Sequence, residues 1–300
     1  MRFADRAGTG KGRLNQAMQR VLSTYLFVNR KLTAAVVEEM ASAGISAIEL
    51  FCSRGHFDYR SAEDAGELRS WLDRSHLRLH SIHAPTLRDF DTAHESATPL
   101  SISDPERVRR QEAVDETKRA MDLVEQVPFR TCVLHVGRPR DVADPRRWDA
   151  AFSSLEHLLL FARHRGITLA LENTPGEMAT PLNLKGFLEE TRLGSLKLCF
   201  DTGHAHLGDG VVAGLDAVRD LIVTTHVHDN RGERDEHLLP YQGTIDWNAA
   251  LAALPPEAPV VLELKEPPAA AANSDLQVFA EKLLGARDVF EKFERTLEQA

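Results

Sequence analysis

The chain of 300 residues has few cysteines, and none of them pair in a metal-binding or redox spacing. Its three cysteines, Cys52, Cys132 and Cys199, form no CxxC motif and no even-numbered framework. This excludes a disulfide scaffold and is typical of a reducing compartment. Cys132 and Cys199 lie inside apolar, strand-like runs, where we interpret them as small core residues.

Long apolar runs are also missing. No run reaches the roughly 18 residues that a membrane helix needs. Residues 1–19 carry Arg and Lys without the apolar stretch of a secretory signal. We therefore expect a cytoplasmic protein with no membrane partner, in which residues 1–19 form a disordered N-terminal extension. The GTGKG at residues 8–12 lacks the GxxxxGK[ST] spacing and follows no strand, so we exclude a phosphate-binding loop.

The net charge of −9 provides no overall basic field for a polyanion. This disfavours nucleic acid as a partner, although a local basic groove is compatible with an acidic protein.

Short apolar runs alternate with longer helical patterns along the rest of the chain. The runs predict strands at 21–27, 46–51, 77–84, 130–137, 167–173, 195–202, 221–229 and 259–265. Their nearly continuous apolar character is typical of strands buried on both faces of a parallel sheet. Amphipathic patterns predict helices at 33–43, 105–127, 148–165, 184–192, 247–253 and 274–297. The second of these helices has Asp104 as its expected N-cap and Pro105 at its first position.

Eight strand–helix units in order, with no break in composition, predict an α/β fold: a single (β/α)₈ TIM barrel over residues 20–297. The alternative is an open, doubly wound sheet. Such a sheet normally has a Gly-rich turn after its first strand, whereas VNRKL follows here.

Ionisable residues stand near the ends of the predicted strands from the second to the eighth. A TIM barrel carries its active site at these strand ends. In chain order they are Glu49, His83, His135, Glu172, Asp201, His226 and Glu263, and His204, His228, Asp235 and His237 follow closely. Any one of them is more often a structural, hydrogen-bonded residue. Burying so many carboxylates together, however, is prohibitive unless cations compensate. Imidazole with carboxylate suits zinc, manganese, iron or cobalt better than calcium, so the set predicts a divalent-metal site.

Four side chains are weaker candidates for substrate binding. Glu49 has a structural role as its alternative, and His228 is a ligand, a substrate contact or a partner of a carboxylate. Arg138 follows His135 and is placed to bind an anionic group, or else belongs to a solvated basic loop. Lys265 is placed to neutralise Glu263 or a substrate.

Several segments of the chain contain these ionisable residues or follow them closely. They are SIHAP (81–85), LHVG (134–137), LENTPG (171–176), CFDTGHAH (199–206), THVHDN (225–230), RDEHLLPYQGTIDW (234–247) and VLELK (261–265). Together they resemble the xylose isomerase-like barrels, a superfamily that includes sugar isomerases and epimerases and the endonuclease IV (AP endonuclease family 2) enzymes. The resemblance covers about residues 20 to 295.

The two branches of this superfamily imply different sites. The sugar branch implies one metal on Glu172, Asp201, His226 and Glu263, with Glu172 and Glu263 as the proton-transfer groups and His204 touching the sugar. The endonuclease IV branch implies three zinc ions on nine groups, all present here: His83, His135, Glu172, Asp201, His204, His226, Asp235, His237 and Glu263.

The Ala-Pro after His83, the THVHDN segment and the LELK segment look more like the sugar branch. We therefore expect a sugar or sugar-phosphate isomerase or epimerase. It would depend on a divalent metal (Mn, Zn, Co or Mg) and act by proton transfer through a metal-stabilised enediolate. The alternatives are an endonuclease IV-like zinc phosphodiesterase acting on abasic DNA, and a metal- or sugar-binding barrel without turnover. The resemblance leaves open whether the chain forms a homo-oligomer.

Overall fold

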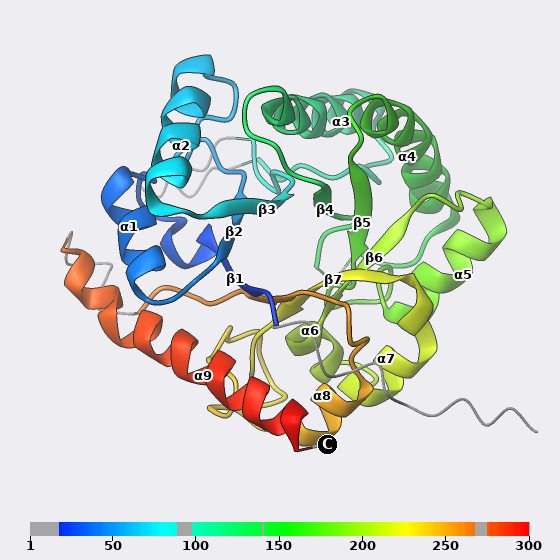
Figure 1. The fold of residues 1–300 in the computed structure, drawn as a ribbon. Helices are drawn as coiled ribbons and strands as arrows, with labels where there is room; N and C mark the ends of the chain where they lie inside the picture. The colour runs from blue at the N-terminus through cyan, green and yellow to red at the C-terminus, as the bar shows by residue number, and fades with distance from the viewer. Residues whose placement is uncertain (1–17, 89–97, 140, 268–274, 300) are drawn as a thin grey trace, which may run out of the picture.

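The strands form a closed ring. A computed structural model describes residues 18–88, 98–139, 141–267 and 275–299. Its eight strands are parallel and pair in chain order, and the last pairs with the first to close the barrel (Figure 1). The expected (β/α)₈ barrel is therefore confirmed. The extension expected at residues 1–19 falls almost entirely outside the described residues.

Each strand lies within or at the edge of a predicted apolar run. The strands are β1 Arg20–Ser23, β2 Ala47–Phe51, β3 Arg78–His83, β4 Thr131–His135, β5 Thr168–Glu172, β6 Lys197–Asp201, β7 Ile222–Val227 and β8 Val260–Leu262. The prediction of a strand through residue 27 was wrong. Thr24–Phe27 form the 3₁₀ helix η1, and the Ser23 hydroxyl accepts a hydrogen bond from the Tyr25 amide at the start of this turn.

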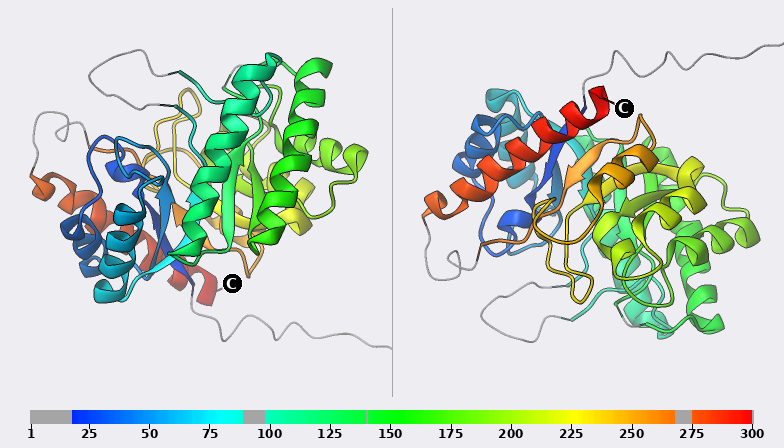
Figure 2. Two further views of the ribbon diagram at one scale, coloured as in Figure 1. Left: turned by 90° about the horizontal axis from the view of Figure 1, so that it is seen from above. Right: turned by 90° about the horizontal axis from the view of Figure 1, so that it is seen from below.

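Helices surround the ring on its outside (Figure 2). They are α1 Ala34–Ser42, α2 Ala62–Ser75, α3 Arg107–Asp122, α4 Pro145–His164, α5 Pro181–Thr191, α6 Thr202–His206, α7 Val211–Val218, α8 Trp247–Ala253 and α9 Ala280–Glu298, with short 3₁₀ turns η2 Leu123–Glu125, η3 Arg219–Leu221 and η5 Leu276–Phe279.

Four helices depart clearly from the sequence predictions, because α2, α6 and α7 were not among the predicted helices and α3 begins later than predicted. The strand and helix patterns left α2 out, although Ser61 and Asp64 form its capping turn, with the Ser61 hydroxyl accepting from the Asp64 amide. Helix α3 begins at Arg107 and not at Pro105. The Asp104 carboxylate caps the Glu106 amide instead, which keeps the two residues before the helix in a turn.

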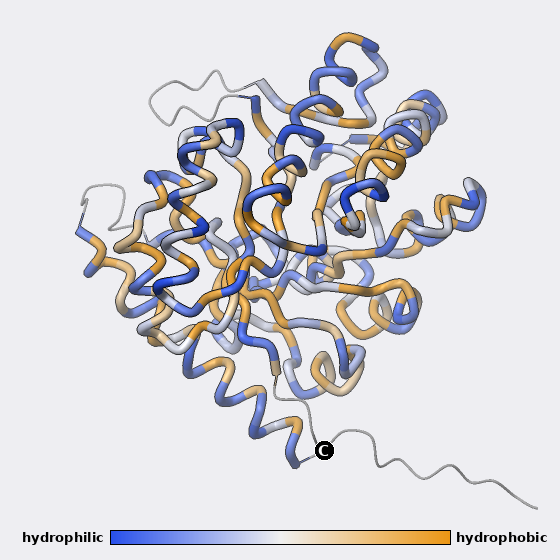
Figure 3. Tube along the Cα trace, turned by 45° about the horizontal axis from the view of Figure 1, so that its top comes forward, coloured by the Kyte–Doolittle hydropathy of each residue, from blue (hydrophilic) through white to orange (hydrophobic). Residues whose placement is uncertain are grey.

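The helices bury one face each against the barrel. In α9 this face is Leu283, Ala286, Val289, Phe290 and Phe293, and the tube coloured by hydropathy alternates accordingly along the helix (Figure 3). Burying each of the two phenylalanines contributes roughly 1.5–3 kcal/mol. In the described part of the chain, no helix has the length and apolar character needed to span a membrane.

Candidate metal centre

The carboxyl ends of the strands bring the predicted ionisable residues to one end of the barrel. A parallel strand order makes this unavoidable, because all eight strands finish on the same side. The residues are the last of their strands in β3 to β6, the last but one in β7, and the first after β8: His83, His135, Glu172, Asp201, His226 and Glu263.

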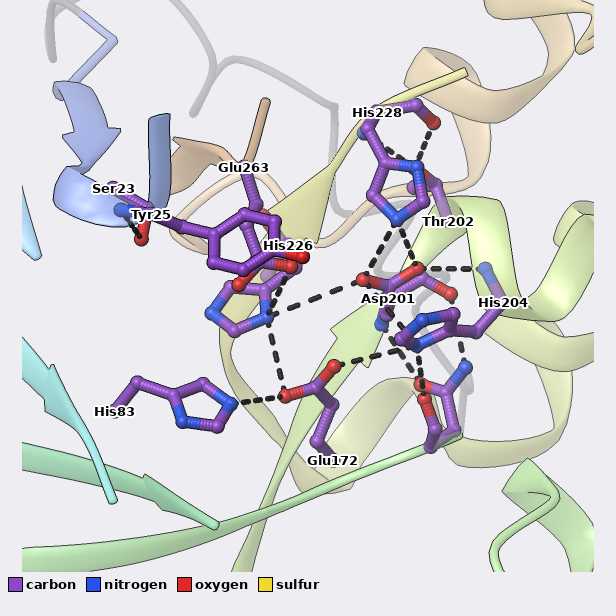
Figure 4. A network of polar contacts seen from close by, with 12 residues as sticks. Ser23, Tyr25, His83, Glu172, Asp201, Thr202, His204, His226, His228 and Glu263 are labelled. Atoms are coloured by element: carbon purple, nitrogen blue, oxygen red, sulfur yellow. Dashed lines mark hydrogen bonds and ion pairs between the residues drawn. The ribbon is translucent and has the colours of Figure 1, made fainter. Parts of the chain in front are cut away.

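Four of these residues enclose a central pocket. Donor atoms of Glu172, Asp201, His226 and Glu263 all lie within 4.8 Å of one another, and all four residues are buried. The Nδ1 atom of His226 faces three carboxylates. It lies 3.2 Å from Glu172 Oε2, 3.6 Å from Glu263 Oε2 and 4.0 Å from Asp201 Oδ2 (Figure 4). Within the described residues this nitrogen has no hydrogen-bond partner, which fits a pocket that binds a cation.

Two further groups of donors flank the central pocket. On one side, His83 Nε2 and His135 Nε2 each lie 3.2 Å from the same oxygen, Oε2 of Glu172, so Glu172 belongs to both groups. The other group contains four donors within the same 4.8 Å limit, which are those of His204, His228, Asp235 and His237. The structure thus brings together all nine residues that the endonuclease IV branch implies, together with His228.

Backbone carbonyls fix the ring nitrogens of three histidines. Nδ1 of His83 lies 2.8 Å from the Ala84 carbonyl, Nδ1 of His204 lies 2.9 Å from the Asn173 carbonyl, and Nδ1 of His237 lies 3.0 Å from the Glu263 carbonyl. A carbonyl only accepts, so each Nδ1 carries a proton. Each Nε2 faces a carboxylate of Glu172 or Asp235, which also only accepts, so in the metal-free protein Nε2 donates as well. A bound cation would displace the Nε2 protons and leave the rings held by their backbone hydrogen bonds.

The electrostatics of the metal-free pocket follow from this crowding. Burial alone would raise the pKa of Glu172, but the rings of His226 and His135 outweigh burial and hold that pKa well below its usual range. Burial would lower the pKa of His226, yet the surrounding carboxylates raise it well above the usual value. Protons on the imidazoles therefore take the place of metal charge, and metal binding must displace them.

Asp201 also organises the turn after β6. Its Oδ1 accepts from the His204 amide at 2.7 Å, which caps α6 and orients His204. Nε2 of His228 lies 3.1 Å from the Asp201 carboxylate, and the His228 ring packs directly against Gly203. His228 thus contacts the Asp201 carboxylate and also belongs to the flanking donor group.

The remaining sequence candidates lie at different depths. Glu49 is fully buried and contacts His226 and Ser81. Arg138 is half-buried on the loop after β4, where its amide and guanidinium both bond Asp141. Lys265 is exposed just after β8, and its amide bonds the His237 carbonyl.

Two residues at the site escaped the sequence predictions. Tyr25 on η1 is mostly buried, with its ring 5.1 Å from that of His237 and 5.0 Å from that of Phe51. Burial, and then the charges of Glu263 and Asp235, raise its pKa. Tyr25 was missed because the first strand was expected to continue through residue 27. Asn173 lies directly after Glu172 and exchanges two hydrogen bonds with the Asp201 backbone, at 2.8 and 2.9 Å.

Residues 37–282 match the family described as the xylose isomerase-like TIM barrel, and the chain belongs to this family. An uncharacterized protein of Sinorhizobium fredii is 27% identical over 199 residues, which cover 59% of this chain and 62% of that protein, less than two thirds of its length. An uncharacterized protein of Methanocaldococcus jannaschii is 26% identical over 248 residues, which cover 78% of each chain.

Solved structures share the fold at low identity. A D-tagatose 3-epimerase-like protein has a TM-score of 0.74 at 20% identity, covering 94% of this chain and 99% of that one. An L-ribulose 3-epimerase has a TM-score of 0.71 at 16% identity, covering 93% and 95%. The IolI protein, whose structure holds a zinc atom, has a TM-score of 0.71 at 15% identity, covering 93% and 98%.

Proposed function

We propose that this protein is a divalent-metal-dependent isomerase or epimerase of a sugar or sugar phosphate. The observation that carries the proposal is the central pocket, in which three buried carboxylates and the unpartnered Nδ1 of His226 converge within 4.8 Å. Three carboxylates packed together without a cation would repel one another strongly. Glu172, Asp201, His226 and Glu263 would hold one ion, and their mixed oxygen and nitrogen donors suit zinc, manganese or cobalt, with magnesium as a further candidate.

The bound ion would supply Lewis acidity, which polarises a carbonyl and acidifies the neighbouring C–H group of the sugar. The protein's part is proton transfer. Glu172 and Glu263 each bring a carboxylate to the pocket from strands β5 and β8. One removes the proton next to the carbonyl, giving an enediolate, and the other returns a proton to the opposite face or to the adjacent carbon.

The surroundings of the pocket support this assignment. His204 and His237 carry Nδ1 protons that are fixed by backbone carbonyls, so their orientations are set before a substrate arrives. Tyr25 and Phe51 add aromatic surface beside the histidines. Some solved structures that share this fold are of epimerases, which is consistent with proton-transfer chemistry at this site.

The proposal is tested by incubating the metal-loaded protein with a panel of ketoses, aldoses and their phosphates in D₂O. Turnover should place one solvent deuterium on the reacting carbon. Replacing Glu172 or Glu263 by Gln should lower kcat by about 10²–10⁴-fold, because each change removes a proton-transfer group. Undiminished turnover in either variant would contradict these roles.

A second function is favoured by one specific observation, the two donor groups that flank the central pocket. Three metal ions held together would suit phosphodiester hydrolysis. Elemental analysis of protein purified without chelator separates the two candidates. Near one ion per chain favours the isomerase or epimerase. Near three zinc ions per chain, together with cleavage of a duplex containing an abasic site, favours the hydrolase.

A further inference from the structure

His226 differs from the other histidines at the site in how its ring is held. His83, His204 and His237 each turn Nε2 toward a carboxylate and bond Nδ1 to a backbone carbonyl, and Nδ1 of His204 also lies 3.3 Å from Glu172 Oε1. His226 is reversed, since its Nδ1 faces the central pocket and its Nε2 faces away from it. In the described part of the chain no backbone carbonyl bonds Nε2, so a different group holds this ring.

The group that faces Nε2 is the carboxylate of Glu49. Its Oε1 lies 3.0 Å from His226 Nε2, and both side chains are completely buried. The approach is oblique, and neither atom has a hydrogen-bond partner within the described residues, so the contact is an ion pair. Glu49 Oε2 already accepts from the Ser81 hydroxyl, and a carboxylate oxygen accepts, so Nε2 is the donor that Oε1 faces.

A second contact holds this carboxylate in place. The Ser81 hydroxyl donates to Glu49 Oε2 at 2.8 Å, and Ser81 is also fully buried. The contact depends on an irregularity in the sheet. Ile48 pairs with Leu79, but Glu49 pairs with Ser81, so β3 contains one extra residue, His80, at this point. Bulges of this kind re-aim side chains next to active sites. In a regular register His80 would stand opposite Glu49, and Ser81 would point to the other face.

From this geometry we propose that Glu49 is a positioning residue for His226. It attracts the Nε2–H group and turns the ring so that Nδ1 faces the central pocket, where metal binding displaces the Nδ1 proton. The Ser81 hydroxyl holds the Glu49 carboxylate in this position. The inference rests on the proposed function in one respect, that the central pocket holds a metal ion. A carboxylate behind a ligating imidazole both orients the ring and increases its basicity.

The test uses Co²⁺ and the full chain. Glu49→Leu removes the acceptor at similar volume, and Glu49→Gln keeps an oxygen but loses the charge. The Kd for Co²⁺ by calorimetry should rise about 10–100-fold in Glu49→Leu, with Glu49→Gln in between. The visible spectrum of bound Co²⁺ should change in both variants, because the His226 donor is displaced.

Glu116→Gln is the matched control. Glu116 is an equally buried carboxylate, but it lies on α3 and bonds Tyr59 and Arg60. Its loss should lower the free energy of unfolding and leave the Kd for Co²⁺ and the spectrum unchanged. Should Glu49→Leu not fold, Glu49→Gln and Ser81→Ala carry the test, each with a smaller rise in Kd than predicted for Glu49→Leu.

A second readout separates this proposal from the proposed function. The ¹⁵N shifts of His226 in the metal-free protein, recorded at a pH high enough to make the ring neutral, report which ring nitrogen keeps the proton. Wild type should show the Nε2–H tautomer, and Glu49→Leu should show a mixture. If wild type binds no Co²⁺ but shows this change of tautomer, the metal-dependent function fails and the positioning role stands. Unchanged tautomer in Glu49→Leu, or unchanged Kd in a folded Glu49 variant, would overturn the positioning role.

Discussion

His56 provides a stability test outside the metal site. It lies on the loop after β2 and is only 1% exposed. Its Nδ1 lies 2.7 Å from the Arg30 carbonyl and therefore carries the proton, while Nε2 is buried and has no hydrogen-bond partner among the described residues. Burial disfavours the charged ring more strongly than the Arg30 and Phe27 carbonyls favour it. Burial accordingly lowers the pKa of His56 to about 4.

The sign of the pH dependence follows from this shift. The folded pKa lies below the unfolded value of about 6.5, so the stabilisation is complete above about pH 6.5 and is lost as the pH falls toward 4. Between pH 7.5 and pH 5, linkage gives a loss of about 2 kcal/mol in the free energy of unfolding. The His56→Gln variant keeps a donor for the Arg30 carbonyl but has no group that titrates in this range.

The assay is urea unfolding of the metal-free protein at both pH values. The change in the free energy of unfolding between the two pH values is compared for wild type and His56→Gln. The titration of the site residues contributes equally to both proteins, and any pH-independent cost of the substitution cancels within the variant. Wild type should lose about 2 kcal/mol more than the variant. His157→Gln, on an exposed position of α4, controls for the loss of one histidine. Equal losses in wild type and His56→Gln would refute the reasoning.

Three further outcomes are expected. In Gly203→Ala the new Cβ would come within 2.0 Å of the His228 ring. We therefore expect the free energy of unfolding in urea to fall by about 1–3 kcal/mol and Co²⁺ to bind more weakly. Wild-type values for both would contradict this packing. Trp247→Phe removes the indole N–H that bonds Asp229 Oδ2 at 2.8 Å, which should cost about 1–3 kcal/mol in the same assay, and an unchanged midpoint would argue against this hydrogen bond. Treatment with a chelator should lower the Tm, since free metal at 100 times its Kd stabilises the folded state by about 2.7 kcal/mol. A Tm that changes neither with chelator nor with added metal would contradict a metal site.

The barrel and the ring of ionisable residues could be predicted from the sequence because both depend on local order. Apolar runs of strand length, separated by helical patterns, leave few alternatives to a parallel barrel. Once the strands are parallel, residues at their carboxyl ends must share one end of the barrel. Glu172, Asp201 and His226 could therefore be assigned to one site from their positions at strand ends, without information on their contacts. Helix α2 escaped the prediction, although its capping turn at Ser61 and Asp64 was a usable signal.

Other features depend on contacts between distant parts of the chain, which no local pattern encodes. The pairing of Glu49 with Ser81 requires the one-residue irregularity in β3, and a shift of one residue exchanges the two faces of a strand. The reversed ring of His226 is visible only when β2 and β7 are placed across the same barrel. The burial of His56 against the Arg30 carbonyl likewise joins two loops 26 residues apart.

Sequence order alone thus specified the kind of fold, the end of the barrel that carries the chemistry, and the residue types gathered there. The tertiary structure decided which nitrogen each histidine turns inward, which carboxylate is shared between donor groups, and which buried groups have no partner. These properties follow from strand register and side-chain rotamers, and packing of the closed barrel sets both.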